Sequence, residues 1–449
     1  MLKTWTLSAP ASVSKLVKDY DLTNDELSRQ SFFSDTFKAK WVSPTKYYNL
    51  FLAHPEWFVL GESAAYTSGV QNSKYFEETI SAAYLRADVK LLNNQLWLVG
   101  GVRFERTADL GAGPKDDLRA TYKQDANGNL LRDATGKLIP VTTDALATAK
   151  LRYTERGAIA SRSYSGYYPS LNSTYYVTDS LVARAAFAQT MGRPNLTEVI
   201  PGITVSDPSA SVRTATIVNS GLQPWTADNY DLSLESYSLK GATIALSLYR
   251  KDIKNFFVQT QSAATLTQLE SFGLSDDYLD YIVTTKTNGG DARIEGYEIS
   301  WRQQLYFLPA WAKGFSTFAN ATISRLSGSN ATDFNPFAHK NINWGLSYVR
   351  RAFSFRYNVA YAYKVTGAAV AASATVPAGT FSYVAPQMTH DWSFEYRFAR
   401  NFAVYGGARN FNGANKRTER AGPGTPVWTR PQSYQNFGTL VTLGIRSDF

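Results

Sequence analysis

Hydrophobic and polar residues alternate with a period of two along most of the chain. In residues 353–364, aromatic or aliphatic side chains occupy every second position, and polar or small residues occupy the positions between them. Successive side chains of a β-strand point to opposite faces of the sheet, so this pattern predicts a strand with one apolar and one polar face. The same alternation recurs in 341–350, 388–398 and 76–91. The period therefore predicts an all-β fold.

The alternation predicts thirteen strands, joined by connections of two kinds. Short connections, such as Asn93-Asn94, alternate with long stretches rich in Gly, Pro, Ser and charge, such as 111–160. Residues 280–288 are expected to lengthen one hairpin at its loop end. The predicted strands are 76–91, 96–108, 163–177, 181–192, 227–239, 242–258, 291–305, 314–326, 341–350, 353–365, 388–398, 401–411 and 435–449.

Residues 1–75 show a weaker pattern. Residues 2–8 are a candidate for a fourteenth strand, residues 12–38 are polar and are expected to form a partly helical loop, and residues 44–60 are rich in aromatic side chains. An odd number of antiparallel strands does not close into a simple ring. The thirteen strands therefore need a further strand at 2–8, or they form an open, curved sheet.

Long strands with tight turns at one end and long loops at the other are typical of an outer-membrane β-barrel. Inside lipid every backbone N–H and C=O group needs a partner within the protein, so a spanning sheet closes on itself. Its apolar face meets lipid and its polar face lines a wet lumen. Soluble sandwiches and propellers also alternate, but their strands usually have about 5–6 residues. We predict an antiparallel transmembrane β-barrel with short periplasmic turns and long extracellular loops.

The composition agrees with such a barrel and excludes several other classes of protein. The chain has 449 residues, of which 18% are charged and 14% aromatic. No apolar run approaches the ~18 residues that a transmembrane helix needs. The absence of cysteine excludes disulfides and thiolate chemistry. The net charge of +9 comes from Lys and Arg spread along the chain, so no basic patch indicates a nucleic acid partner.

Enzymatic chemistry finds little support in the sequence. The histidines are His54, His339 and His390, which are far apart, so neither a metal site nor a catalytic triad is indicated. The Ser-x-x-Lys match at Ser12 and Lys15 has no accompanying partner motif. We therefore expect a protein that is not an enzyme and holds no metal or cofactor.

Several short motifs follow one another in order along residues 76–449. They are Phe76-Glu77-Glu78, Gly100-Gly101-Val102-Arg103, Tyr167-Tyr168-Pro169-Ser170-Leu171-Asn172, Gly192-Arg193-Pro194-Asn195, Asn229-Tyr230-Asp231, Tyr249-Arg250-Lys251-Asp252-Ile253 and Ile294-Glu295-Gly296-Tyr297-Glu298. In this order they resemble the β-barrel of TonB-dependent receptors, in particular the long-loop receptors often proposed to import glycans.

The resemblance implies a barrel of roughly 22 strands, of which this chain supplies about 13–14. Residues 76–449 are then the C-terminal part of the receptor barrel, and residues 1–75 are the start of the barrel portion with a long, partly helical loop. The family's signal sequence, TonB-binding segment and plug domain have no counterpart in the pattern, so we expect the plug domain to be absent from this chain.

The resemblance also implies the function. The chain would belong to an outer-membrane receptor of a Gram-negative bacterium that takes up a scarce ligand, namely a siderophore, a cobalamin-like molecule or an oligosaccharide. Implied partners are outer-membrane lipid, the plug domain, the TonB energy complex and the barrel-assembly machinery. Two alternatives stay open: a complete passive pore of about 14 strands, and a soluble glycan-binding β-protein.

Charged residues on the polar faces of the strands are predicted to face the lumen. An Arg or Lys on the lipid face costs about 2–4 kcal/mol at the midplane of the membrane, which fixes this assignment. We expect these charges to hold the wall and the plug in register rather than to touch the ligand. They are Arg86, Arg103, Glu105, Arg184, Asp231, Glu298, Arg302, Arg356 and Arg397.

Ligand capture is expected in the long loops. Their aromatic rings suit stacking on sugars or on an aromatic chelator, and their basic side chains attract anions. The candidates are Tyr122, Tyr153, Trp225, Phe381, Trp428, Lys416 and Arg417. The final strand carries a predicted assembly signal, because outer-membrane barrels commonly end in an aromatic residue. Here Phe449 ends the chain, five residues after Gly444.

Overall fold

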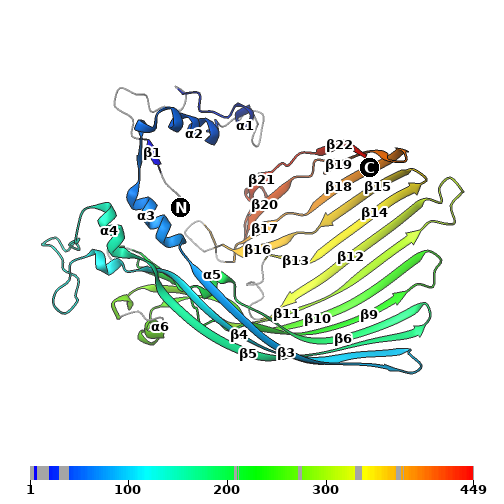
Figure 1. The fold of residues 1–449 in the computed structure, drawn as a ribbon, viewed down its shortest axis with the longest axis horizontal. Coiled ribbons are helices and arrows are strands. Elements are labelled where there is room, and N and C mark those ends of the chain that lie inside the picture. Colours follow the sequence, from blue (N-terminus) through cyan, green and yellow to red (C-terminus); the bar gives the residue numbers. More distant parts are fainter. Residues whose placement is uncertain are drawn as a thin grey trace.

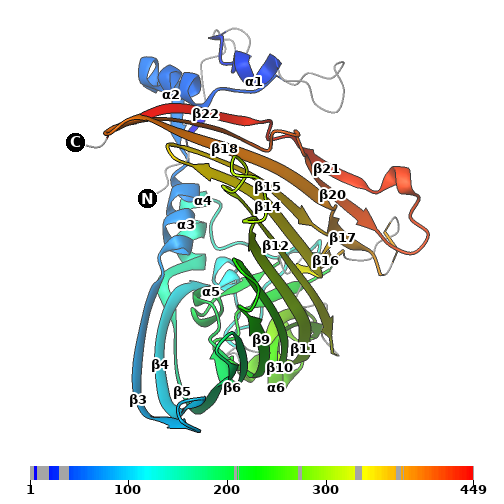
Figure 2. The same cartoon turned by 90° about the vertical axis from the view of Figure 1, so that its right-hand side faces the viewer.

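The structure is a computed structural model that describes residues 5–7, 20–29, 40–206, 210, 212–271, 276–328, 336–370, 376–377 and 379–447. Its largest feature is one antiparallel sheet bent into an open trough (Figures 1 and 2). We call these strands the wall. They are β3 (Tyr75–Leu91), β4 (Leu96–Asp116), β5 (Tyr153–Thr178), β6 (Leu181–Gly192), β9 (Trp225–Ser236), β10 (Ala242–Ala263), β11 (Ile282–Gln304), β12 (Phe315–Ser327), β14 (Lys340–Arg350), β15 (Phe353–Ala362), β18 (Gln387–Ala399), β19 (Phe402–Arg409) and β22 (Leu440–Ser447).

Each strand of the wall pairs with the wall strand before it and the one after it along the chain, from β3 at one edge to β22 at the other. All thirteen predicted strands are present, which confirms the fold class. Several are longer than predicted at their loop ends: β5 begins at Tyr153 rather than at 163, and β10 and β11 continue as a hairpin to Ala263 and from Ile282. The expected lengthening at 280–288 is therefore observed.

Tight turns close the hairpins at the other end of the wall. Leu92, Asn93 and Asn94 all have positive φ, at 54°, 53° and 69°, between β3 and β4. Asn tolerates this left-handed conformation because its short amide side chain can satisfy nearby backbone groups. Gly241, with φ 71°, supplies the same geometry before β10 without a Cβ penalty. The turn end is thus built from residues that suit sharp reversals.

The wall stays open in the part of the chain that the structure describes. There, β3 and β22 each pair with a strand of the wall on one side only (Figure 2). The candidate strand at 2–8 forms as β1 (Trp5–Leu7), but it pairs with β2 (Phe58–Leu60) and not with the wall. It therefore does not serve as a fourteenth strand of the wall. None of the helices among these residues is long and apolar enough to cross a membrane.

Helices between residues 25 and 72 lie at the loop end of the wall. They are α1 (Asp25–Arg29), α2 (Pro44–Ala53) and α3 (Glu62–Asn72), and α3 runs directly into β3 (Figure 1). Ser63 Oγ donates to the carbonyl of Ala145 at 3.0 Å, where α4 (Ala145–Arg152) begins. Tyr66 OH donates to the carbonyl of Tyr153 at 3.1 Å. These bonds fix α3 against the start of β5.

A compact hydrophobic cluster also lies at the loop end, and we call it the loop core. It gathers side chains from η3 (Leu118–Thr121), β7 (Ile203–Val205), β8 (Thr214–Ile217), α6 (Leu266–Ser271), η4 (Asp276–Tyr278) and the start of β11. β8 pairs in parallel with β11. Its buried members are Leu118, Val205, Ala215, Ile217, Ala264, Leu269, Tyr278, Tyr281 and Val283.

A second, smaller sheet continues the last hairpins beyond the wall, and we call it the hairpin sheet. Its strands run in the order β13 (Phe337–Ala338), β16 (Val365–Ala369), β17 (Phe381–Val384), β20 (Lys416–Ala421) and β21 (Pro431–Gln435). The short helix η6 (Val427–Thr429) lies between β20 and β21. Two folded assemblies, the loop core and the hairpin sheet, therefore stand on the loop end of the wall.

Candidate functional site

The strand register places the nine predicted lumen charges on one face of the wall. Residues paired across neighbouring strands point to the same side of a sheet. Arg184 pairs with Thr174 and Ser233, and the ladder continues through Ser247 to Glu298. The same ladders connect Arg86, Arg103, Glu105, Asp231, Arg302, Arg356 and Arg397. We call this the inner face.

The opposite face, here called the outer face, is apolar over its middle rows. One ladder joins Leu232, Leu248, Tyr297 and Ile323 across β9 to β12. Near the C-terminal edge, Leu443 is 75% exposed in β22. Apolar side chains exposed in a continuous band are unfavourable in water and favourable in lipid. The two faces of the wall therefore suit two different surroundings.

Ion pairs join several inner-face charges to one another. Arg103 Nη2 lies 2.7 Å from Glu105, whose other oxygen pairs with Arg193. Arg184 donates to Glu235 at 2.9 Å and to Thr174 at 2.9 Å. The Arg184 contacts connect β6 with β9 and with β5, and Arg193 brings the segment after β6 onto the wall. Sequence reasoning missed Arg193 as a partner because it lies just outside a predicted strand.

A buried ion pair holds the same segment further up the wall. Arg162 Nε lies 2.9 Å from Asp109 Oδ2, with side chains 8% and 1% exposed. Arg162 also donates to the carbonyl of Leu222, which precedes β9. Asp109 Oδ1, Arg162 Nη2 and Tyr164 OH are buried without a hydrogen bond among the described residues. Position 109 lay one residue beyond a predicted strand and 162 one residue before another, so only a longer alternation would have found this pair.

A groove of about 510 Å³ lies on the inner face at β3, β4 and β5. Its lining combines charge, aromatic rings and amide or hydroxyl groups from Arg86, Trp97, Arg103, Tyr168, Asn172 and Thr174. Lys90 Nζ lies 5.8 Å from the centroid of the Trp97 ring. Such a lining offers hydrogen-bond donors and acceptors to a polar surface packed against it.

The predicted ligand residues fall into three separate places. Tyr153 begins β5, with the Arg152 guanidinium 4.9 Å from its ring, and Tyr122 packs against the loop core. Trp225 begins β9, and its ring centroid lies 6.1 Å from that of Phe256. These residues lie at the loop end, but they do not converge on one pocket with the other four.

The remaining four lie in the hairpin sheet. Phe381 is in β17, Lys416 and Arg417 are in β20, and Trp428 is 83% exposed in η6. Arg417 Nη2 lies 2.7 Å from Glu419. The hairpin sheet therefore presents aromatic and basic groups together at the loop end.

One of the two residues of the predicted assembly signal can be described. Gly444 lies on the inner face of β22 opposite Tyr405, and a Cβ there would come within 2.5 Å of the Tyr405 hydroxyl. Glycine lets the ring of its neighbour lie flat across the strand. Phe449 lies outside the described residues.

The shifted pKa values at the loop end come from burial and from hydrogen bonds that stabilise the local structure. Burial in the loop core, with Asp117 nearby, raises the pKa of Tyr278 to about 12. Hydrogen bonds from the Asn129 and Thr135 side chains, and then from backbone N–H groups, lower the pKa values of Asp125 and Asp133 in two successive turns of the loop after β4. Among the described residues, no group of His, Asp or Glu is arranged to hold a metal ion.

Comparison with known proteins identifies a matching family and solved structures with a similar fold. A family model described as TonB dependent receptor-like, beta-barrel, matches residues 4–411. The ferric-catecholate import receptor Fiu of E. coli K12 is similar with a TM-score of 0.51 and 15% identity, covering 84% of this chain and 45% of that chain. A variant of the ferric enterobactin receptor PfeA of Pseudomonas aeruginosa, in complex with enterobactin, gives 0.51 and 15%, covering 84% and 55%.

The chain thus spans about half the length of these solved structures. At such identities the similarity shows the fold alone. A search of the curated protein sequences finds no match.

Proposed function

Because this chain belongs to the TonB-dependent receptor-like β-barrel family, we propose that it takes part in energy-coupled uptake of a scarce ligand across the outer membrane. Members of this family are outer-membrane proteins of Gram-negative bacteria and are transporters, not enzymes. In the proposal, the strands of the wall supply part of the receptor barrel. The inner face surrounds the plug domain of the receptor, and the loops meet the ligand.

The observation that carries the proposal is the separation of the two faces across the whole sheet. Nine charged residues from seven strands lie on the inner face, while the middle rows of the outer face are apolar. A soluble β-protein would not leave such a band exposed to water. The inner face still has polar groups that a plug could contact. Some of them line the groove at Arg86 and Arg103.

The proposed ligand is a ferric siderophore, a cobalamin-like molecule or an oligosaccharide. On the hairpin sheet, Lys416 and Arg417 in β20 offer positive charge and Trp428 in η6 offers an exposed aromatic ring, and these two properties suit an anionic aromatic chelate. The two similar solved structures are named as receptors for a ferric catecholate and for ferric enterobactin. The aromatic rings alone suit a sugar. An uptake measurement separates these classes.

The test uses the receptor in the outer membrane of a Gram-negative host that lacks competing receptors. Labelled ferric catecholate, cobalamin and an oligosaccharide are offered with and without an uncoupler of the proton-motive force. We expect one class to accumulate and the uncoupler to abolish accumulation. The variant K416Q/R417Q should raise the half-saturating concentration of an anionic ligand by about tenfold. The variant K123Q/R132Q, which removes two charges from another loop, is the matched control.

Uptake that ignores the uncoupler would overturn the energy-coupled proposal. In that case, a steady open-channel current in planar bilayers would identify a passive pore instead. A protein recovered as a soluble monomer without detergent would contradict both membrane functions.

A further inference from the structure

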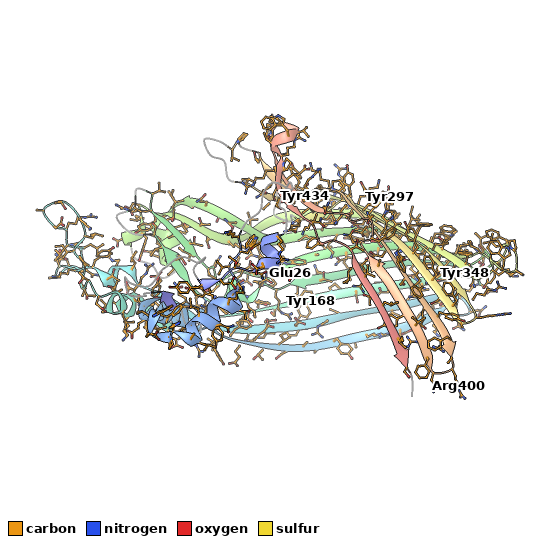
Figure 3. The ribbon with its side chains drawn as sticks, turned by 90° about the horizontal axis from the view of Figure 1, so that it is seen from above. Glu26, Tyr168, Tyr297, Tyr348, Arg400 and Tyr434 are labelled. Carbon is orange, nitrogen blue, oxygen red and sulfur yellow. The ribbon has the colours of Figure 1, made fainter. Side chains whose placement is uncertain are left out.

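A groove of about 450 Å³ lies on the outer face across β9, β10, β11 and β12. Two adjacent rows of the register build it. The lower row is apolar and consists of Leu232, Leu248, Tyr297 and Ile323. The upper row, two residues nearer the loops, consists of Tyr230, Arg250, Glu295 and Arg325. Figure 3 labels Tyr297 on its strand.

The change from apolar to charged side chains is therefore abrupt. Two residues along a strand span about 7 Å. Below the groove, β10 continues the apolar face with Leu246 and Ile244 toward its tight turn. Above it, the strands continue as the long loop hairpins. Tyrosines at such a boundary are typical of the level where acyl chains meet headgroups. The groove thus lies at the membrane interface on the loop side.

Two cations beside the groove have no ion pair among the described residues. Arg325 is exposed in β12, and Lys340 begins β14 directly opposite Ile323. By contrast, Arg250 and Arg293 both pair with Asp252, at 2.8 Å and 2.7 Å. Glu295 pairs in register with Arg250 and with Arg325 and offsets one of those two charges. The upper row together with Lys340 therefore carries a surplus of two positive charges.

We propose that this groove binds a phosphate-bearing lipid of the outer leaflet. One acyl chain lies along the apolar floor between Tyr230 and Tyr297, and Arg325 and Lys340 bind the phosphate. Guanidinium and ammonium groups form charge-assisted hydrogen bonds with phosphate that a neutral headgroup does not offer. A free phosphate ion would leave the apolar floor unused. Chemistry and depth together therefore select an anionic amphiphile.

The proposal goes beyond uptake, because the site lies on the opposite face of the wall from the lumen. Binding there would be selective, whereas the general lipid coat of a barrel requires only apolar contact. A bound phosphate would also bridge β12 and β14, which meet at Ile323 and Lys340.

The test measures lipid bound to the full chain after isolation from outer membranes in mild detergent. Native mass spectrometry counts bound bis-phosphorylated lipid A, and the same lipid without phosphates is offered in parallel. We expect the wild type to retain the phosphorylated form selectively. The variant R325Q/K340Q should lower its retention by roughly tenfold or more.

Two further variants make the outcome decisive. R302Q/R356Q removes two inner-face arginines, one from β11 and one from β15, and should retain lipid as the wild type does. R325K/K340R keeps both charges and should restore most of the retention. Equal retention of the dephosphorylated lipid, or an equal loss in R302Q/R356Q, would overturn the proposal and indicate non-selective annular lipid only.

Discussion

The wall and the loop core use the same apolar residue types in opposite ways. In the loop core, Leu269 and Val283 are fully buried, while in β22 of the wall Leu443 and Ile445 are 75% and 71% exposed. In water, burying apolar surface stabilises a fold. In lipid, the backbone ladder stabilises the sheet and the outer side chains only match the solvent. The comparison shows one chain folded for two solvents.

Buried and half-buried charges join the two regions. Arg162 and Asp109 link the upper wall to the residues before β9, and Lys286 of β11 pairs with Glu198 of α5 (Leu196–Val199). Because the Arg162–Asp109 pair is almost fully buried, removing one of its partners leaves an uncompensated charge. The connection between the wall and the loop segments therefore depends on ion pairs rather than on single residues.

The largest expected effect comes from breaking this join. Replacing Asp109 by Ala leaves the Arg162 guanidinium buried without its partner. We therefore expect the free energy of unfolding to fall by about 3–5 kcal/mol. Limited proteolysis of the 193–222 segment and urea unfolding would measure it. The double variant D109L/R162M removes both charges and should recover most of the stability. A double variant as labile as D109A would show that the pair is not what holds the segment.

The contrast between the two solvents is tested by matched truncations. Leu269→Ala leaves a cavity in the loop core and should cost about 2–5 kcal/mol. Leu443→Ala on the outer face should cost far less in a lipid bilayer, because lipid chains fill the space. Unfolding of both variants in the same bilayer provides the measurement. Equal losses would contradict the division into a lipid-facing wall and a core that is buried from water.

The smallest expected effect is a pH dependence of the loop core. The pKa of Tyr278 is raised in the folded protein to about 12 by burial, from about 10 in an unfolded chain. The folded state therefore holds the proton more tightly, and this stability is present below pH ~10 and lost as the pH rises through about 12. Alkaline unfolding followed by tryptophan fluorescence should show the loss. In Tyr278→Phe this dependence should disappear while the wall is unchanged.

Sequence patterning predicted the wall because each strand faces two environments. Alternation over ten or more residues is hard to mistake, and the thirteen predicted segments are the thirteen strands of the wall. The start of β5 was missed because it extends into the loop region, where Tyr153 is not followed by the same alternation, whereas the start of β11 lies in the hairpin extension predicted at 280–288. A strand with similar surroundings on both faces leaves a weaker pattern.

The loop core could not be predicted from patterning. Leu118, Val205 and Val283 lie in three different segments, each rich in polar residues, and only their meeting in space makes them a core. For the same reason, Tyr122 and Trp428 were grouped as ligand residues on their type alone, whereas the structure separates them. Lys340 gave no signal because its importance depends on its register with Ile323.

The order of the strands in the wall has a consequence for the time course of folding. Every pair of wall neighbours is also consecutive among the wall strands along the chain, and many are joined by tight turns. The hairpins with tight turns close short loops, so each of them can form at low entropic cost. The loop core brings Leu118 to Val283, across most of β5 to β10. It can consolidate only once those strands have inserted, so its completion would report that this part of the wall is in place.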